Sequence, residues 1–170
     1  MRGYVQLYTG NGKGKTTAAF GLAIRALMAG KRVYVGQFVK SMKYNETKLE
    51  NFLDTLTIEQ YGRGCFIIDE PEPIDVEMAR AGLERCRKIL SGGEYDMVIL
   101  DEVCIALYYR LFSVESLISV LNERKERVEV ILTGRYAPQQ LIDYADLVTE
   151  MGEVKHYYRQ GVEARDGIER

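Results

Sequence analysis

The sequence predicts an α/β fold of three layers, in which a mostly parallel central sheet carries helices on both faces. Short apolar runs alternate along the chain with segments of helical periodicity. The run Met97–Leu100 is wholly apolar, as is typical of a strand covered on both faces. With 170 residues and 46% hydrophobic content, the chain can build one sizeable core, so we expect a single domain over residues 1–170.

The first strand is expected over Val5–Thr9, and the first helix over Lys15–Met28, ending before Gly30. Later strands are expected over Arg32–Val39, Leu56–Tyr61, Asp96–Leu100, Val128–Thr133 and Leu147–Val154. Helices are expected between them over Thr47–Leu53, Ile74–Leu90, Val114–Glu123 and Pro138–Tyr144. This alternation predicts parallel strands joined by right-handed crossovers.

Charge and apolar patterning exclude two classes of partner. The 23 Lys and Arg against 25 Asp and Glu give a formal charge of -2, so no overall cationic field would hold nucleic acid or anionic lipid. No apolar stretch approaches the roughly 18 residues that a membrane span needs. Met1-Arg2-Gly3 leads directly into an apolar alternation without the pattern of a signal or transit peptide, so we expect a cytoplasmic protein.

Cysteine and histidine usage limits the chemistry. Cys65, Cys86 and Cys104 are widely spaced and form no CxxC pair, which argues against a disulfide framework or a zinc knuckle. His156 is the only histidine, which excludes a histidine-rich metal site and disfavours a Ser-His-Asp triad. An enzyme built from this chain is therefore expected to work without a histidine base.

A glycine-rich turn with a lysine and two threonines lies between the first strand and the first helix. It reads Thr9-Gly10-Asn11-Gly12-Lys13-Gly14-Lys15-Thr16-Thr17. Glycines allow backbone N–H groups to turn toward a phosphate, and the helix N-terminus adds a positive end. Lys15 supplies a point charge and Thr16 a hydroxyl for Mg²⁺, as in a P-loop, although the usual pattern has glycine where this chain has Thr9. We favour phosphate binding over a turn that binds nothing.

Two carboxylates, Asp101 and Glu102, follow the apolar strand Met97–Leu100. In P-loop proteins an acid at this place reaches the Mg²⁺ held by the loop hydroxyl. Solvated acids at a strand end are the alternative, but the P-loop favours a metal site formed by Thr16 with Asp101 or Glu102. Spacing does not show which carboxylate lies nearer the ion.

These motifs, taken together with others in collinear order, resemble the P-loop ATP:corrinoid adenosyltransferase family, also called the cob(I)alamin adenosyltransferases. The resemblance covers nearly the whole chain and rests on Thr9–Ala19, Gln37–Lys40, Val98–Glu102, Thr133–Arg135, Ala145–Glu150, Val154–His156, Gly161 and Gly167–Glu169. It implies that the enzyme moves the 5′-deoxyadenosyl group of ATP to the Co(I) of a reduced corrinoid and releases triphosphate, in adenosylcobalamin synthesis or salvage. Because Co(I) is a nucleophile without a proton, this reaction needs no general base.

The resemblance also implies roles for single residues. Lys15, Thr16 and Glu102 would be catalytic, with Mg²⁺ as cofactor. Nucleotide or corrinoid would be bound by the loop and by residues at the strand ends: Gly10, Asn11, Gly12, Lys13, Gly14, Lys15, Thr16, Thr17, Gln37, Lys40 and Arg135. Phe66 is the candidate for crowding the lower face of the corrinoid, in a chain that has no tryptophan.

Further expectations concern partners and alternatives. ATP and corrinoid are the expected substrates, a flavoprotein reductase is a candidate source of Co(I), and a homodimer is the expected assembly. Either the loop Arg63–Pro73 or the polar tail from Tyr157 to Arg170, with or without a second subunit, is expected to cover the site when both substrates are bound. Two other functions stay open on the residues alone, namely a P-loop small-molecule kinase and a non-catalytic ATP-binding module.

Overall fold

Six parallel strands form one sheet in the order β3-β2-β4-β5-β1-β6. The structure, a computed structural model, describes residues 2–63 and 70–169. The strands are β1 (Val5–Thr9), β2 (Val33–Phe38), β3 (Leu56–Tyr61), β4 (Met97–Asp101), β5 (Glu129–Thr133) and β6 (Leu147–Glu150). The predicted parallel α/β fold is thereby confirmed, and β4 and β1 are separated by β5 alone.

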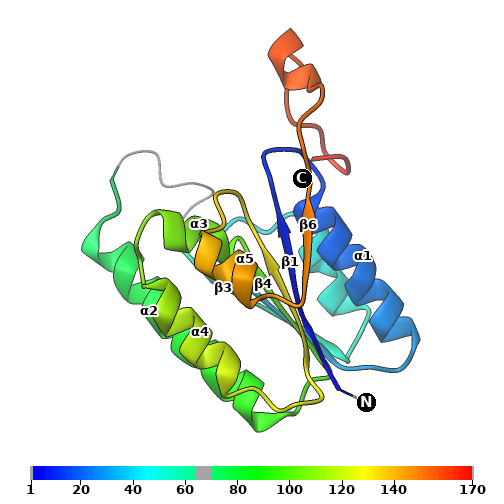
Figure 1. Cartoon of the computed structure of the whole chain (residues 1–170). Coiled ribbons are helices and arrows are strands. Elements are labelled where there is room, and N and C mark those ends of the chain that lie inside the picture. Colours follow the sequence, from blue (N-terminus) through cyan, green and yellow to red (C-terminus); the bar gives the residue numbers. More distant parts are fainter. Residues whose placement is uncertain (1, 64–69, 170) are drawn as a thin grey trace.

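Helices cover both faces of this sheet (Figure 1). Helix α1 (Lys15–Met28) and the 3-10 helix η1 (Asn45–Asn51) pack on one face. The other face carries α2 (Pro73–Gly92), α3 (Val103–Tyr108), α4 (Val114–Asn122) and α5 (Gln139–Tyr144). The three predicted layers are therefore present.

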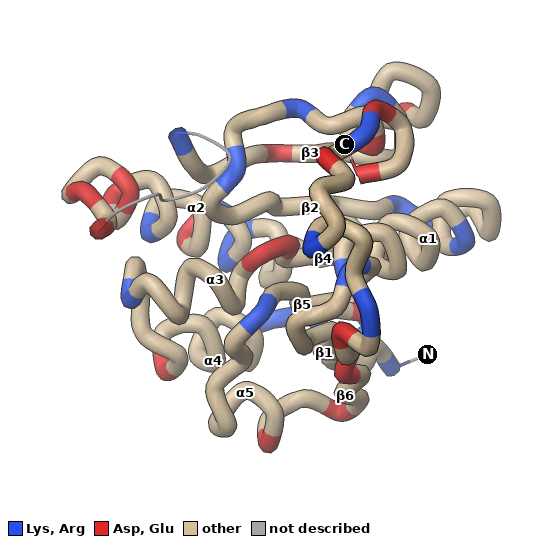
Figure 2. Tube along the Cα trace, turned by 90° about the horizontal axis from the view of Figure 1, so that it is seen from above, with Lys and Arg blue, Asp and Glu red and all other residues tan. Residues whose placement is uncertain are grey.

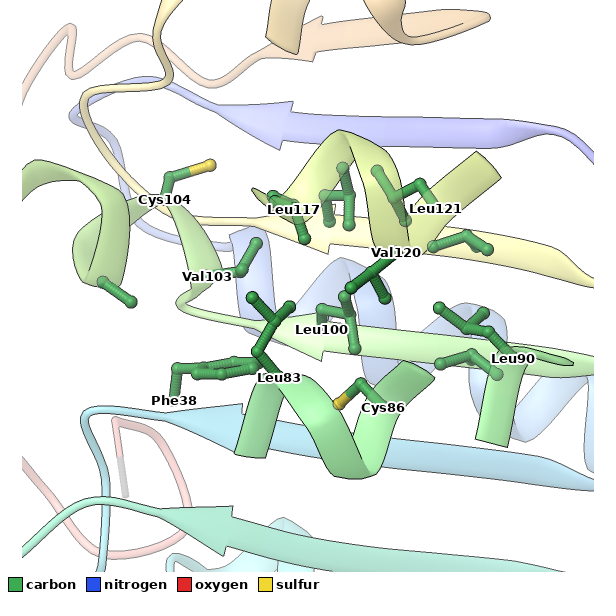
Figure 3. Close-up of a cluster of buried hydrophobic side chains, with 14 of the residues drawn as sticks. Phe38, Leu83, Cys86, Leu90, Leu100, Val103, Cys104, Leu117, Val120 and Leu121 are labelled. Atoms are coloured by element: carbon green, nitrogen blue, oxygen red, sulfur yellow. The ribbon is translucent and has the colours of Figure 1, made fainter. Parts of the chain in front are cut away.

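The strand alternation explains the two-sided core. Met97 and Ile99 of β4 face α1, whereas their neighbours Val98 and Leu100 face α2 and α4, and all four are buried. Successive side chains of a strand point to opposite faces, so a strand covered on both faces must be apolar throughout. Figure 3 shows the α2–α4 side of this core, where Leu83 and Cys86 meet Leu100 and Val120.

Besides the unpredicted 3-10 helix η2 (Tyr157–Gln160), three elements differ from the prediction. Helix α3 was not predicted, because six residues directly after a strand are too few to show a helical periodicity in the sequence. The segment expected as a helix over Thr47–Leu53 is the 3-10 helix η1. The last strand was expected to reach Val154 but ends at Glu150, because Met151 turns toward the P-loop and accepts a hydrogen bond from the Gly12 N–H at 2.7 Å.

The carboxyl ends of all six strands meet at one edge of the sheet, because the strands are parallel. The P-loop follows β1 at this edge, and the C-terminal segment with the 3-10 helix η2 (Tyr157–Gln160) rises above it (Figure 1). Figure 2 looks onto this edge of the sheet from above. Over residues 2–63 and 70–169, no helix is long and apolar enough to cross a membrane.

Candidate active site

The P-loop runs from β1 to α1 and encloses the ammonium of Lys15. Lys15 Nζ donates to the carbonyl oxygens of Gly10 at 2.8 Å and Gly12 at 2.7 Å, and the residue is buried. Glycine is required at both positions, because a Cβ atom there would lie 2.5 and 2.7 Å from the Met151 carbonyl oxygen. The end of β6 thus packs directly against the loop and fixes its shape.

The N-terminus of α1 is arranged differently from those of α2 and α4. Helix α2 has a capping box of Glu72 and Asp75, and Ser113 accepts a hydrogen bond from the Ser116 N–H at the start of α4. Helix α1 begins after Gly14, at φ 118°, with no side-chain cap and no acidic residue in its first turn. Its first N–H groups and positive dipole end are therefore left for an anion from outside the helix.

Asp101 ends β4 and is the most heavily hydrogen-bonded side chain at this edge. Its Oδ1 accepts from the Thr16 hydroxyl at 2.9 Å and the Thr133 hydroxyl at 2.7 Å. Its Oδ2 accepts from Lys40 Nζ at 2.9 Å and Gln37 Nε2 at 3.1 Å. With 0% of its surface exposed, Asp101 is a fully paired buried carboxylate that ties the P-loop to three neighbouring strands.

Glu102 is held in an unusual backbone conformation immediately after Asp101. Its φ of 57° lies in the left-handed region, and its N–H donates to the Thr133 hydroxyl at 2.9 Å. Within the two described ranges, no hydrogen bond reaches its carboxylate. Because Asp101 is fully paired and the Glu102 carboxylate is not, we call Glu102 the uncommitted acid of the pair. Backbone strain of the kind seen at Glu102 is concentrated at functional sites.

Four charged groups set the electrostatics of the site. Burial raises the pKa of Glu102 above its usual value, the charge of Asp101 raises it further, and Lys40 and Lys15 oppose the rise. Burial also favours a higher pKa for Asp101, but Lys40 and the surrounding hydrogen bonds hold it below its usual value. Burial lowers the pKa of Lys15, whereas Lys40, despite its burial, has a raised pKa because it faces both carboxylates. Asp101 is thus stabilised as an anion, and Glu102 is not.

The other loop residues named from the sequence lie around this centre. Asn11, Lys13 and Thr17 are exposed, and Lys13 Nζ donates to the Ile168 carbonyl of the tail at 3.2 Å. Arg135 is exposed after β5, and its charge acts on both Lys15 and Glu102.

Gln37 and Lys40 were expected to contact nucleotide or corrinoid, and the structure places both against Asp101. Phe66 and Cys65 lie outside the described residues.

The whole chain matches one protein family. The family model described as ATP:corrinoid adenosyltransferase BtuR/CobO/CobP covers residues 1–170. The chain belongs to this family. Corrinoid adenosyltransferases of Escherichia coli (strain K12) and Sinorhizobium sp are 38% and 37% identical to it, over 99% of this chain and 86% and 80% of the relatives. The Salmonella typhimurium (strain LT2) corrinoid adenosyltransferase CobA is 38% identical over the same shares, 99% and 86%. The resemblance inferred from the motifs is confirmed, and with it the adenosyltransferase activity.

Two polar residues of this adenosyltransferase were missed as site residues. Thr133 joins Asp101 to the backbone of Glu102, and Gln60 Nε2 donates to Gln37 Oε1 at 2.9 Å and to the Met42 carbonyl at 3.0 Å. Thr133 is the last residue of β5 and Gln60 the second-last residue of β3, so a polar residue at the carboxyl end of a strand was the available signal in both cases. Through them, a polar row extends from β5 to β3 along the edge of the sheet.

Proposed function

We propose that the P-loop, Asp101 and Glu102 form the centre at which this adenosyltransferase moves the 5′-deoxyadenosyl group of ATP to Co(I). In this step an electron pair of Co(I) forms the Co–C bond while the bond between the 5′ carbon and the triphosphate oxygen breaks. Triphosphate leaves with the electron pair of the broken C–O bond, so charge grows on the phosphate oxygens. The protein must stabilise that charge and align the two substrates, and it has no proton to remove.

The observation that carries this proposal is the uncapped N-terminus of α1 with the Lys15 ammonium beside it. An anion in the loop would accept hydrogen bonds from backbone N–H groups. At the same place it would be attracted by the positive end of the helix and by the lysine charge. The donors are fixed by the contact between Gly12 and Met151 before any ligand arrives. Preorganised donors of this type stabilise a leaving group without further rearrangement.

Mg²⁺ is proposed as the cofactor, with Thr16 and Glu102 as its protein ligands. Hydroxyl and carboxylate oxygens are the donors that Mg²⁺ prefers, and one or two of them suffice when phosphates complete the shell. Asp101 already accepts from four donors, so it would orient the Thr16 hydroxyl. The ion would neutralise charge on the triphosphate.

The test is anaerobic incubation with ATP, Mg²⁺ and chemically reduced cobalamin, followed by the absorbance change of Co–C bond formation. We expect one triphosphate for each adenosylated corrinoid. A P-loop kinase would instead produce ADP, and a non-catalytic module would consume no ATP, so either result would overturn the proposal.

Assembly, electron supply and location complete the proposal. We expect a cytoplasmic homodimer that receives Co(I) from a flavoprotein reductase. The resemblance to the family supports these three statements, and sedimentation velocity and reconstitution with a reductase would test the first two.

A further inference from the structure

Two exposed tyrosines stack on each other at the edge of the sheet that carries the P-loop. Tyr108 ends α3, and Tyr136 lies in the turn after β5. Their ring centroids are 4.5 Å apart with an interplanar angle of 31°, and their exposed fractions are 56% and 54%. The Tyr109 ring meets Tyr108 edge-on at 5.4 Å. We call Tyr108 and Tyr136 the tyrosine pair.

The backbone that positions Tyr136 in this pair is conformationally strained. Tyr136 has φ 61°, in the left-handed region that bulky residues avoid. The turn before it is packed closely on α3, because a Cβ atom at Gly134 would lie 2.8 Å from Cys104 Cβ. Neither ring is needed to fill the core, since each leaves about half of its surface to solvent. Strain that persists in a rigid turn points to a use for the side chain it positions.

The tyrosine pair lies beside the candidate active site. Arg135, the residue before Tyr136, acts electrostatically on Lys15 and Glu102. Helix α3 starts directly after Glu102, so its last residue, Tyr108, lies about 9 Å along the helix from that acid. A ligand that reaches from Glu102 across α3 would therefore meet the pair.

A planar conjugated molecule with polar groups at its rim suits such a surface. Aromatic rings bind planar π-systems by stacking or edge contacts, and tyrosine hydroxyls can meet polar groups around the plane. A corrinoid macrocycle has this chemistry, whereas ATP would be held at the P-loop. A second copy of the chain fits less well. Two half-exposed rings offer roughly 150–250 Å² of surface for burial, whereas each partner in a stable interface buries about 800 Å².

We propose that the tyrosine pair is a corrinoid-binding subsite, which contacts the macrocycle at a distance from the cobalt and sets its affinity and orientation. This inference rests on the proposed function. The pair touches neither phosphates nor metal, so it should contribute to corrinoid binding and leave ATP binding unchanged.

The test compares Tyr108→Leu and Tyr136→Asn with the unaltered protein. Leucine keeps apolar bulk without a π-face, and asparagine tolerates the left-handed conformation. We expect the corrinoid KM, and the Kd for aquocobalamin measured by equilibrium dialysis, to rise about 3–10-fold in each variant. The Kd for ATP should stay unchanged. Tyr4→Leu is the matched control, since Tyr4 is 50% exposed before the start of β1, at the opposite edge of the sheet.

The possible results are distinct. If the unaltered protein adenosylates cobalamin and both variants retain its corrinoid KM and Kd, the subsite is overturned and the proposed function stands. If the unaltered protein forms no Co–C bond, the proposed function itself fails. If both variants change only the sedimentation coefficient, the pair is an interface between copies, and the subsite is again overturned.

Discussion

The Lys15 side chain is buried and charged, and both properties suit it to stabilise an anion. In the structure its ammonium is held by two carbonyl oxygens of the P-loop. Burial lowers its pKa, although Glu102 opposes the effect. A charge kept at a fixed place among few competing waters interacts strongly with an anion that develops beside it.

Lys15→Ala is expected to lower turnover by about 10²-fold or more, the range seen when one electrostatic stabiliser is removed. The reason is that the lysine charge matters more as triphosphate leaves than while ATP is bound. Turnover at saturating substrates and the Kd for ATP would be measured together. Lys13→Ala is the comparison, because Lys13 is exposed and contacts the tail. The turnover of this variant should fall much less than that of Lys15→Ala. Near-normal turnover of Lys15→Ala would rule out the P-loop assignment.

Glu102→Gln is expected to lower turnover and raise the Mg²⁺ requirement while it stabilises the fold at pH 7. The folded-state pKa of Glu102 is raised, so the folded protein holds the proton more readily than the unfolded chain. Stability is therefore lost as pH rises through the interval between the ordinary glutamate pKa and the raised one. Glutamine removes that loss, so Tm at pH 7 should rise, by about 2–4 °C for each kcal/mol relieved.

The stabilising effect of the same substitution should largely disappear near pH 4, where the glutamate is mostly protonated in both states. Asp101→Asn should behave oppositely, because it leaves Lys40 without its anionic partner and costs about 1–3 kcal/mol. Thermal melts of the three proteins from pH 4 to pH 8 would measure both effects. A lower Tm for Glu102→Gln at pH 7 would contradict the assignment of Glu102 as the uncommitted acid.

At the scale of elements, α2 packs against β3 through one glycine. A Cβ atom at Gly82 would lie 2.4 Å from Cγ of Tyr61. The Tyr61 hydroxyl hydrogen-bonds with the Tyr34 hydroxyl and donates to the Glu59 carboxylate, which also accepts from Arg85 of α2. This close contact decides how β3, one of the two outermost strands, is held on the sheet.

Gly82→Ala is expected to destabilise the fold by about 1–3 kcal/mol, because Tyr61 must leave its position or α2 must move. Urea unfolding monitored by circular dichroism would measure the change. Gly21→Ala in α1 is the control, since nothing lies within 4 Å of its Cβ position, and it should stabilise by about 0.5–1 kcal/mol. Equal effects of the two substitutions would contradict the packing argument.

The C-terminal segment is attached to two parts of the site. The Ile168 carbonyl accepts from Lys13 of the P-loop, and Asp166 accepts from Asn45 of η1 at 2.7 Å. Within the segment, Glu169 is held by Arg165 and Tyr157. The segment thus bridges elements on either side of the P-loop edge.

Deletion of residues 161–170 is expected to raise the corrinoid KM more than the Kd for ATP, because a cover over the edge shields the reduced corrinoid from water. Steady-state kinetics with each substrate varied would measure both. Asp166→Asn is a milder comparison that weakens only the contact with Asn45. An unchanged corrinoid KM after deletion would show that the segment is not part of the cover.

At the scale of the whole molecule, one sheet with one core on each face predicts a single unfolding transition. Mg·ATP at 100 times its Kd should raise the free energy of unfolding by about 2.7 kcal/mol. At about 2–4 °C per kcal/mol, Tm should rise by about 5–10 °C. Differential scanning calorimetry would measure this, and Lys15→Ala should show a smaller shift. Two transitions, with only one of them shifted, would contradict a single domain.

Much of the fold and part of the site follow from short-range sequence patterns. The alternation in β1, the wholly apolar β4 and the glycine-rich turn before Lys15 each involve neighbours in the chain, and each predicts its element. The short helix α3 and the end of β6 at Glu150 were not predicted. Helix α3 has too few residues for a periodic pattern, and β6 ends where a distant loop binds it.

The sequence by itself therefore determined the fold class, the family and the identity of the phosphate loop and its two acids. Only the tertiary structure decided that Asp101 is the fully paired carboxylate and Glu102 the uncommitted one. The partners of Asp101 come from α1, β2, β5 and the residues after β2, which lie 32 to 85 positions away in the chain. Burial and pairing over such separations depend on how the strands are ordered in the sheet, and no local pattern specifies that order.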